Sequence, residues 1–131
     1  MSRGGGEHQS KFCAHCGRVI APRRVPNADP ADLKYCSVAC RRQAGARVHR
    51  RLEAAMVELL AARRADASIC PSETARAVFG DNFKSHMEDA RKAARRLSHR
   101  GVTKITQKGK TVDPASFRGP IRVARGKQFE L

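Results

Sequence analysis

The sequence predicts an α+β protein in which a small cysteine-rich module precedes a larger domain of helices and strands. Three observations support this prediction. Two close pairs of cysteines lie near the N-terminus, apolar residues recur with helical spacing from about residue 47 to residue 100, and strand-like alternation begins after Gly101. Together they indicate a treble-clef-like zinc ribbon followed by a winged helix-turn-helix domain.

The 131 residues divide by composition into four stretches. Residues 1–10 are Gly-rich and polar, so we expect a disordered tail. Residues 11–45 hold the cysteine pairs and form the predicted zinc ribbon, which is too short and too polar to fold without a metal. Residues 46–125 form the predicted winged-helix domain, and residues 126–131 are expected to be a frayed C-terminal tail.

The cysteine pairs predict a site for one Zn²⁺ per chain. Nineteen residues separate Cys16 from Cys36, and closely spaced thiolates on two turns are typical of a structural tetrahedral zinc site. The predicted ligands are Cys13, Cys16, Cys36 and Cys40. An iron–sulfur centre is the alternative, and it ranks lower because a turn and a helix start suit a single ion.

Two further residues have side chains that could bind a metal or react, but both are predicted to be structural. His15 lies inside the first pair and is predicted to point outward without binding the metal. Cys70 stands alone, and we expect it to be a small buried residue, because no Cys–His–Asp set can be assembled around it from the sequence.

The elements of the first module are short. Gly17 permits a turn whose backbone N–H groups face the sulfurs. Val19 and Ile20 suggest a short strand, and residues 21–32 form a loop with three prolines. Ser37 is the expected N-cap of a helix that runs to about Gln43.

Three helices are predicted next. The first spans about residues 46–64, and one alternative is that it continues the helix of the first module. The second starts at Pro71 with Ser72 as its N-cap, and Gly80 ends it. The third begins at Asp81 or Asn82 and runs to about Arg100, and Gly101 stops it.

The pattern then changes to strands. Residues 102–106 predict a strand, residues 107–110 a turn and residues 111–112 the return strand of a hairpin, which would be the wing. Residues 121–123 give a last extended segment.

The charge balance indicates a polyanionic partner. The chain has 27 Lys and Arg against 12 Asp and Glu, a formal net charge of +15, and a nucleic acid would relieve the resulting repulsion. A membrane surface is not expected, because no helix has a strongly apolar face. The sequence has no Gly-rich phosphate loop, carboxylate pair or serine triad. We therefore expect neither an enzyme nor a small-molecule substrate.

The expected nucleic-acid contacts lie on the third helix and the wing. In helix-turn-helix proteins the second helix of the motif enters the major groove, and that role falls here to residues 83–100. A basic surface of the zinc ribbon could bind phosphate as well, through Arg18, Arg23, Arg24, Arg41 and Arg42. The alternative for the helix is a solvated basic face. The predicted contact residues are Lys84, Arg91, Lys92, Arg95, Arg96, Lys104, Lys108 and Lys110.

Two stretches resemble known families. Residues 11–42, with Cys-x-x-Cys-Gly-Arg and the run from Leu33 to Arg42, resemble an uncharacterised zinc-ribbon family of bacterial proteins. Residues from about 50 to 125 resemble an uncharacterised family with a predicted winged-helix fold. The second resemblance rests on Ile69 to Ala77, Ala93 to Leu97, Ile105 to Lys110, and Val112 to Arg122. Neither resemblance implies an activity.

The resulting hypothesis is a non-enzymatic, zinc-binding, nucleic-acid-binding protein with a regulatory role. DNA is a more strongly expected partner than RNA. The protein is expected in the cytoplasm, at the nucleoid if it is bacterial. The alternatives are a protein–protein adaptor and an RNA- or ribosome-associated factor.

Overall fold

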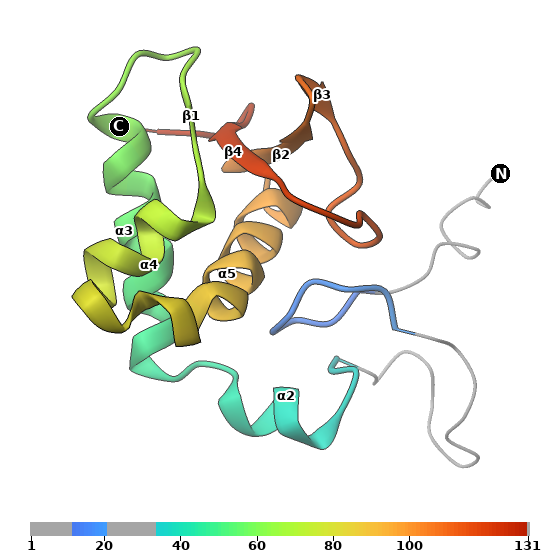
Figure 1. Ribbon diagram of the computed structural model, residues 1–131. Coiled ribbons are helices and arrows are strands. Elements are labelled where there is room, and N and C mark those ends of the chain that lie inside the picture. The colour runs from blue at the N-terminus through green and yellow to red at the C-terminus, as the bar shows by residue number, and fades with distance from the viewer. Residues whose placement is uncertain (1–11, 21–33, 131) are drawn as a thin grey trace, which may run out of the picture.

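The computed structural model describes residues 12–20 and 34–130 (Figure 1). The predicted disordered tail over residues 1–10 and the predicted loop over residues 21–32 lie outside these ranges. We call residues 12–20 and 34–45 the N-terminal module, and residues 47–130 the helical domain. The elements are α2 (Val38–Gln43), α3 (Arg47–Ala61), β1 (Ser68–Ile69), α4 (Pro71–Phe79), the 3₁₀ helix η2 (Gly80–His86), α5 (Met87–His99), β2 (Thr103–Gln107), β3 (Lys110–Thr111) and β4 (Arg122–Arg125).

The sheet is antiparallel with strand order β1-β4-β2-β3. β2 pairs with β3 only near the turn, where Thr106 faces Thr111. Its longer partner is β4, with Ile105 facing Val123. The predicted hairpin is therefore only the tip of the sheet, because the loop over residues 112–121 returns the chain to the other side of β2. The α+β class with a small antiparallel sheet is confirmed.

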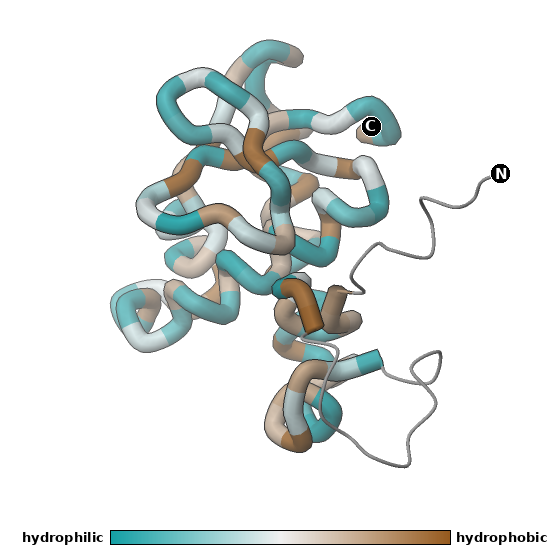
Figure 2. The backbone as a smooth tube through the Cα atoms, turned by 90° about the vertical axis from the view of Figure 1, so that its right-hand side faces the viewer, coloured by the Kyte–Doolittle hydropathy of each residue, from teal (hydrophilic) through white to brown (hydrophobic). Residues whose placement is uncertain are grey.

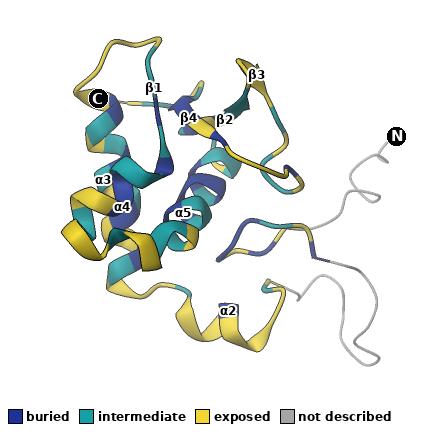
Figure 3. Cartoon of the chain, viewed as in Figure 1, coloured by how far each residue is buried: buried dark blue, intermediate teal, exposed yellow. Residues whose placement is uncertain are grey.

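The core lies where α3, α4 and α5 meet the sheet (Figures 1 and 3). Short alanine side chains at positions 90, 93 and 94 of α5 are fully buried and let the other helices approach closely. The larger buried side chains are Leu52, Met56, Leu60, Ile69, Leu97, Ile105 and Val123. Figure 2 shows that hydrophobic segments of the backbone are short and alternate with hydrophilic ones, which is consistent with a small core.

The helix ends follow local chemistry, with three differences from the sequence predictions. Gly45, at φ +79°, separates α2 from α3, so these helices are not continuous. The N-cap of α4 is Cys70, not Ser72, because Pro71 occupies the first helical position and the Glu73 carboxylate accepts the Cys70 N–H at 2.9 Å. The predicted third helix begins as the 3₁₀ segment η2 and becomes α-helical only at Met87.

The C-terminal segment packs against the domain. The Gly126 N–H donates to Val102 O at 2.9 Å, and the Gln128 N–H donates to Gly101 O at 2.8 Å. Phe129 contacts the core beneath the Arg125 guanidinium. The prediction that this tail frays is therefore wrong for residues 126–130. None of the helices in the described ranges has the length and apolarity needed to cross a membrane.

Candidate metal centre and its contact with the helical domain

The four predicted ligands come together. The Sγ atoms of Cys13, Cys16, Cys36 and Cys40 all lie within 4.8 Å of one another. The Cys36 Sγ lies 3.7 Å from the Cys16 Sγ and 3.6 Å from the Cys40 Sγ. Thiolates at about 2.3 Å from a tetrahedral ion stand about 3.8 Å apart. The sulfur cluster therefore has the size that one metal ion requires.

Backbone N–H groups of the Cys13–Gly17 turn face one of these sulfurs. The His15 and Cys16 N–H groups approach the Cys13 Sγ at 3.4 and 3.5 Å. The turn is closed by the Gly17 N–H, which donates to Cys13 O at 2.9 Å. These donors favour a thiolate at Cys13, as outer-shell groups do around metal ligands.

The second cysteine pair is placed by the start of α2. Ser37 caps this helix, and its hydroxyl oxygen accepts the Cys40 N–H at 3.1 Å, which confirms the predicted cap. The two halves of the module are joined by the Ala14 N–H, which donates to Lys34 O at 2.7 Å. Cys36 is the exposed ligand, whereas the other three are buried.

The pKa values of the thiols differ within the cluster. Burial raises the pKa of Cys13, but hydrogen bonds from the backbone of Cys16, Cys36 and His15 outweigh it and bring the value down to about 7. Burial and the neighbouring thiols raise the pKa of Cys16, and they raise that of Cys36 to about 12. Four thiolates therefore repel one another, and a bound cation is what allows all of them to ionise.

α5 holds the Cys13–Gly17 turn by its backbone. The Arg96 Nη1 donates to His15 O at 2.7 Å, the Arg95 Nη1 to Cys16 O at 3.1 Å, and the His99 Nε2 to Gly17 O at 2.8 Å. Three consecutive carbonyl oxygens are thus bound by side chains of one helix. The turn lies directly beside α5 in Figure 1.

The contact is close because Gly17 has no side chain. Its φ is +80°, and a Cβ there would lie 2.2 Å from the Arg95 Cβ. On one side of the turn, the Phe12 ring stacks on His99 with centroids 3.5 Å apart. On the other, the Arg18 Nη1 donates to Phe117 O at 2.6 Å. The N-terminal module is therefore fixed between α5 and the loop that precedes β4.

His15 is buried, so the prediction that it points outward is wrong. Only 1% of it is exposed. Its ring meets that of His49 in α3 edge-on, with centroids 4.5 Å apart, and it contacts Gln43 Oε1 at 3.2 Å. Burial and the Arg96 charge lower the pKa of His15 to about 4, which keeps the imidazole neutral. His15 thus joins the module to α3, and it is not one of the clustered ligands.

The arrangement joins two sequence families. Residues 49–126 match a family described as a protein of unknown function, DUF3253. The chain belongs to this family. Residues 6–43 of this DUF3253 member also match a second family, described as an uncharacterized protein conserved in bacteria, DUF2256. No curated protein matches the chain. The two predicted family resemblances are confirmed, and the boundary between them falls where α2 gives way to α3.

Two of the predicted nucleic-acid contacts on α5 are turned inward. Arg95 is 2% exposed, and its Nη1 also contacts Glu88 Oε2 at 3.0 Å. The Arg96 side chain is 9% exposed, and its Nε pairs with Glu53 Oε2 at 2.5 Å. The expected exposure of these two side chains is wrong, because the N-terminal module covers this face of α5.

The other predicted contact residues stay accessible. Arg91 is partly exposed beside Glu88, at 3.5 Å, and Lys92 is half-buried. Lys84 of η2 is exposed, as are Lys104, Lys108 and Lys110 along the β2–β3 hairpin. In the N-terminal module Arg41 and Arg42 are exposed, Arg18 is half-buried, and Arg23 and Arg24 lie outside the described residues.

Sequence reasoning missed the residues that join the two parts. Glu53 binds both Arg96 and Arg100, and His99 binds the turn. A Glu in one amphipathic helix and an Arg in another carry no signal that they face each other. Only the spacing of Arg95, Arg96 and His99 on one helical face could have suggested a shared partner.

Proposed function

We propose that this protein is a non-enzymatic, zinc-stabilised winged-helix protein that binds nucleic acid, duplex DNA in preference to RNA, with a regulatory role at the bacterial nucleoid. The observation that carries the proposal is the unbalanced charge of the sheet and its loops. From residue 101 to residue 130, which holds β2, β3, β4 and their loops, the chain has seven Lys and Arg against two Asp and Glu. Lys104, Lys108 and Lys110 are exposed there, and no acidic partner of theirs occurs in the described ranges.

The four-cysteine donor set supports zinc. Thiolates are soft ligands that suit Zn²⁺ or iron–sulfur centres. All four sulfurs lie within 4.8 Å of one another, which suits a single ion, whereas a cluster of several irons would hold them farther apart. The zinc would be held by Cys13, Cys16, Cys36 and Cys40, and its chemistry would be structural, since four thiolates leave no open position.

The order of elements supports a winged helix. A helix, a short strand, two helical segments and then antiparallel strands follow one another as in that fold. The first strand joins the sheet through β4, so β1 and β2 flank β4. In this assignment α5 is the recognition helix, and the β2–β3 hairpin with the loop to β4 forms the wing.

The placement of the N-terminal module shifts the proposed contacts toward the wing. Arg95 and Arg96 are engaged by backbone carbonyls and carboxylates, so the central face of α5 is not offered to a groove. Lysines along the hairpin suit phosphate oxygens, which are the commoner targets in protein–DNA complexes. The proposed binding is therefore dominated by the nucleic-acid backbone.

Replacing Lys104, Lys108 and Lys110 together by Gln tests this proposal. The affinity for a fluorescent 20-base-pair duplex is measured by anisotropy at several salt concentrations. Each lost phosphate contact removes about 0.9 from the log–log salt slope on duplex DNA. We expect the triple variant to lower the slope by about 2 to 3 and to weaken binding on the order of 100-fold at low salt.

The matched control removes the same charge elsewhere. Arg47, Arg51 and Arg64 are exposed on α3 and the segment after it, and changing all three to Gln should leave the slope within about 1 of the wild type. Equal losses in both triple variants would reject the wing as the binding surface. Tighter binding to an RNA hairpin would favour the RNA-associated alternative, and binding to neither would favour the adaptor.

A further inference from the structure

A hollow of about 370 Å³ lies where the N-terminal module, α5 and the loop before β4 meet. It is lined by Arg18 of the N-terminal module, by Glu88, Arg91 and Arg95 of α5, and by Phe117, Gly119 and Pro120 of the loop. We propose that this hollow is a phosphate-binding site, occupied by a backbone phosphate of the nucleic acid. The proposal rests on the proposed function. It adds that the N-terminal module supplies part of the surface that contacts the nucleic acid.

The charges around the hollow are unbalanced. The lining has three guanidinium groups and only one carboxylate, that of Glu88. This carboxylate already forms ion pairs with Arg91 at 3.5 Å and with Arg95 at 3.0 Å. Arg95 is almost fully buried, and its Nε has no hydrogen-bond partner in the described part of the chain. Buried guanidinium donors are normally satisfied, and an anion in the hollow would supply an acceptor for this one.

One aromatic ring holds two of these cations in place. The Arg18 guanidinium lies 4.4 Å from the centroid of the Phe117 ring, and that of Arg95 lies 5.2 Å from it. The cations therefore repel one another, and a phosphate bound among them would relieve that repulsion while accepting several N–H groups.

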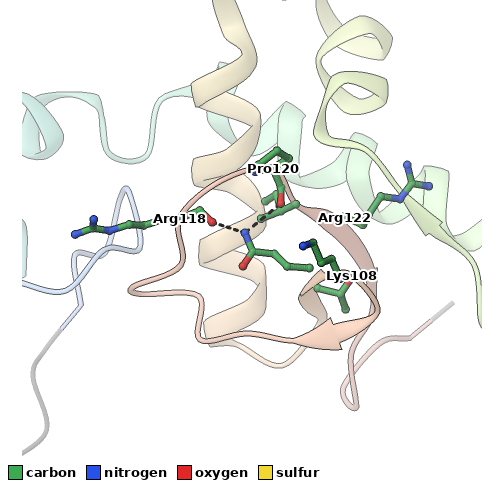
Figure 4. A pocket seen from close by; sticks show the side chains of 7 residues that line it. Lys108, Arg118, Pro120 and Arg122 are labelled. Atoms are coloured by element: carbon green, nitrogen blue, oxygen red, sulfur yellow. Dashed lines mark hydrogen bonds between the residues drawn. The ribbon is translucent and has the colours of Figure 1, made fainter.

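A second hollow with basic lining residues lies next to Pro120. It measures about 580 Å³, shares Pro120 with the first, and is lined also by Lys108, Arg118 and Arg122. Figure 4 shows Arg118 directed to one side of Pro120, while Lys108 and Arg122 lie on the other. The Gln107 side chain supports this loop, because its Nε2 donates to the carbonyls of Arg118 and Pro120.

The two hollows give a path for a phosphodiester backbone. Arg18 and Arg91 line the first hollow, Arg118 and Lys108 line the second, and Pro120 lines both. Successive phosphates of one strand could bind along these hollows. The loop over residues 118–120 would lie against the sugar-phosphate chain.

Inorganic phosphate tests the first hollow by itself. The zinc-loaded full-length protein is titrated with potassium phosphate, with potassium chloride at matched ionic strength as the reference, and the arginine Nε–Hε signals are followed by NMR. We expect saturable shifts of the Arg95, Arg18 and Arg91 signals at millimolar phosphate. The Arg91→Gln variant should weaken this binding at least fivefold. The Arg64→Gln variant, which removes a side chain that is 84% exposed, should not.

Duplex binding then decides whether the site serves nucleic acid. Arg91→Gln should lower the salt slope by about 0.9, while Arg64→Gln should leave it unchanged. Phosphate shifts absent in the wild type, or a slope unaltered by Arg91→Gln while the lysine variant still loses affinity, would overturn this inference and leave the proposed function standing. If the wild type binds neither duplex DNA nor RNA, the proposed function is rejected. The phosphate titration would still test whether the first hollow binds an anion.

Discussion

Replacing Gly17 by Ala is expected to loosen the N-terminal module from α5 and to lower the free energy of unfolding by about 3 kcal/mol. Two effects add. The backbone at φ +80° is unfavourable for a residue with a Cβ, and the new methyl would lie 2.2 Å from the Arg95 Cβ. That atom is fixed to the helix backbone and cannot move aside without shifting α5 or the turn. Urea unfolding of the metal-loaded protein, followed by circular dichroism, measures the loss.

A second glycine separates the two effects. Gly109 has φ +82°, and a Cβ there would meet nothing within 4 Å. Gly109→Ala therefore introduces the same backbone strain without a collision, and we expect it to cost only about 1 kcal/mol. Equal losses in the two variants would contradict the close approach between the turn and α5.

Removing the metal is expected to unfold the N-terminal module while the helical domain keeps its structure. Structural zinc contributes on the order of 10 kcal/mol to the folding of comparably small zinc-binding peptides. The β2–β4 pairing and the α3–α5 packing involve none of the four cysteines. We expect one zinc ion per chain by elemental analysis. After chelation, amide exchange should become fast at Ala14 and Gly17, and it should stay slow at Ile105 and Val123.

The fifth cysteine provides the matched control. Cys16→Ser removes a clustered ligand and should lower the zinc content below half an ion per chain. Cys70→Ser changes a cysteine outside the cluster at the N-cap of α4, where serine is a favoured residue, and should leave one ion bound. Full zinc occupancy in Cys16→Ser would contradict the assigned site.

The parts of the structure that could be predicted from the sequence are those set by local chemistry. The metal ligands follow from two cysteine pairs with turn and cap residues beside them, as at Ser37. The helices follow from apolar spacing, and Gly101 at φ +80° ends α5 as expected. Even here, the N-cap of α4 is Cys70, two residues earlier than the predicted Ser72, because proline favours the first helical position and Pro71 occupies it.

The parts that could not be predicted depend on contacts between distant residues. The strand β4 pairs with β2 across the ten-residue loop 112–121, and the short alternation after Gly109 gave no means of choosing β4 over β3. Arg95 and Arg96 have the pattern of a solvated basic face. Their burial depends on Glu53, on Glu88 and on carbonyls about 80 residues away in the sequence. A single sequence does not show which partner a long cationic side chain will meet.

The binding of the Cys13–Gly17 turn by α5 has a consequence for the order of folding. The four metal ligands lie within 28 residues of one another, so the module can capture its ion through local loop closure. Its docking needs Arg95, which is 79 residues beyond the carbonyl of Cys16. During synthesis the module leaves the ribosome well before that helix exists. We therefore expect the local turns of the module to form first, and its docking onto α5 to be a late, long-range step of folding.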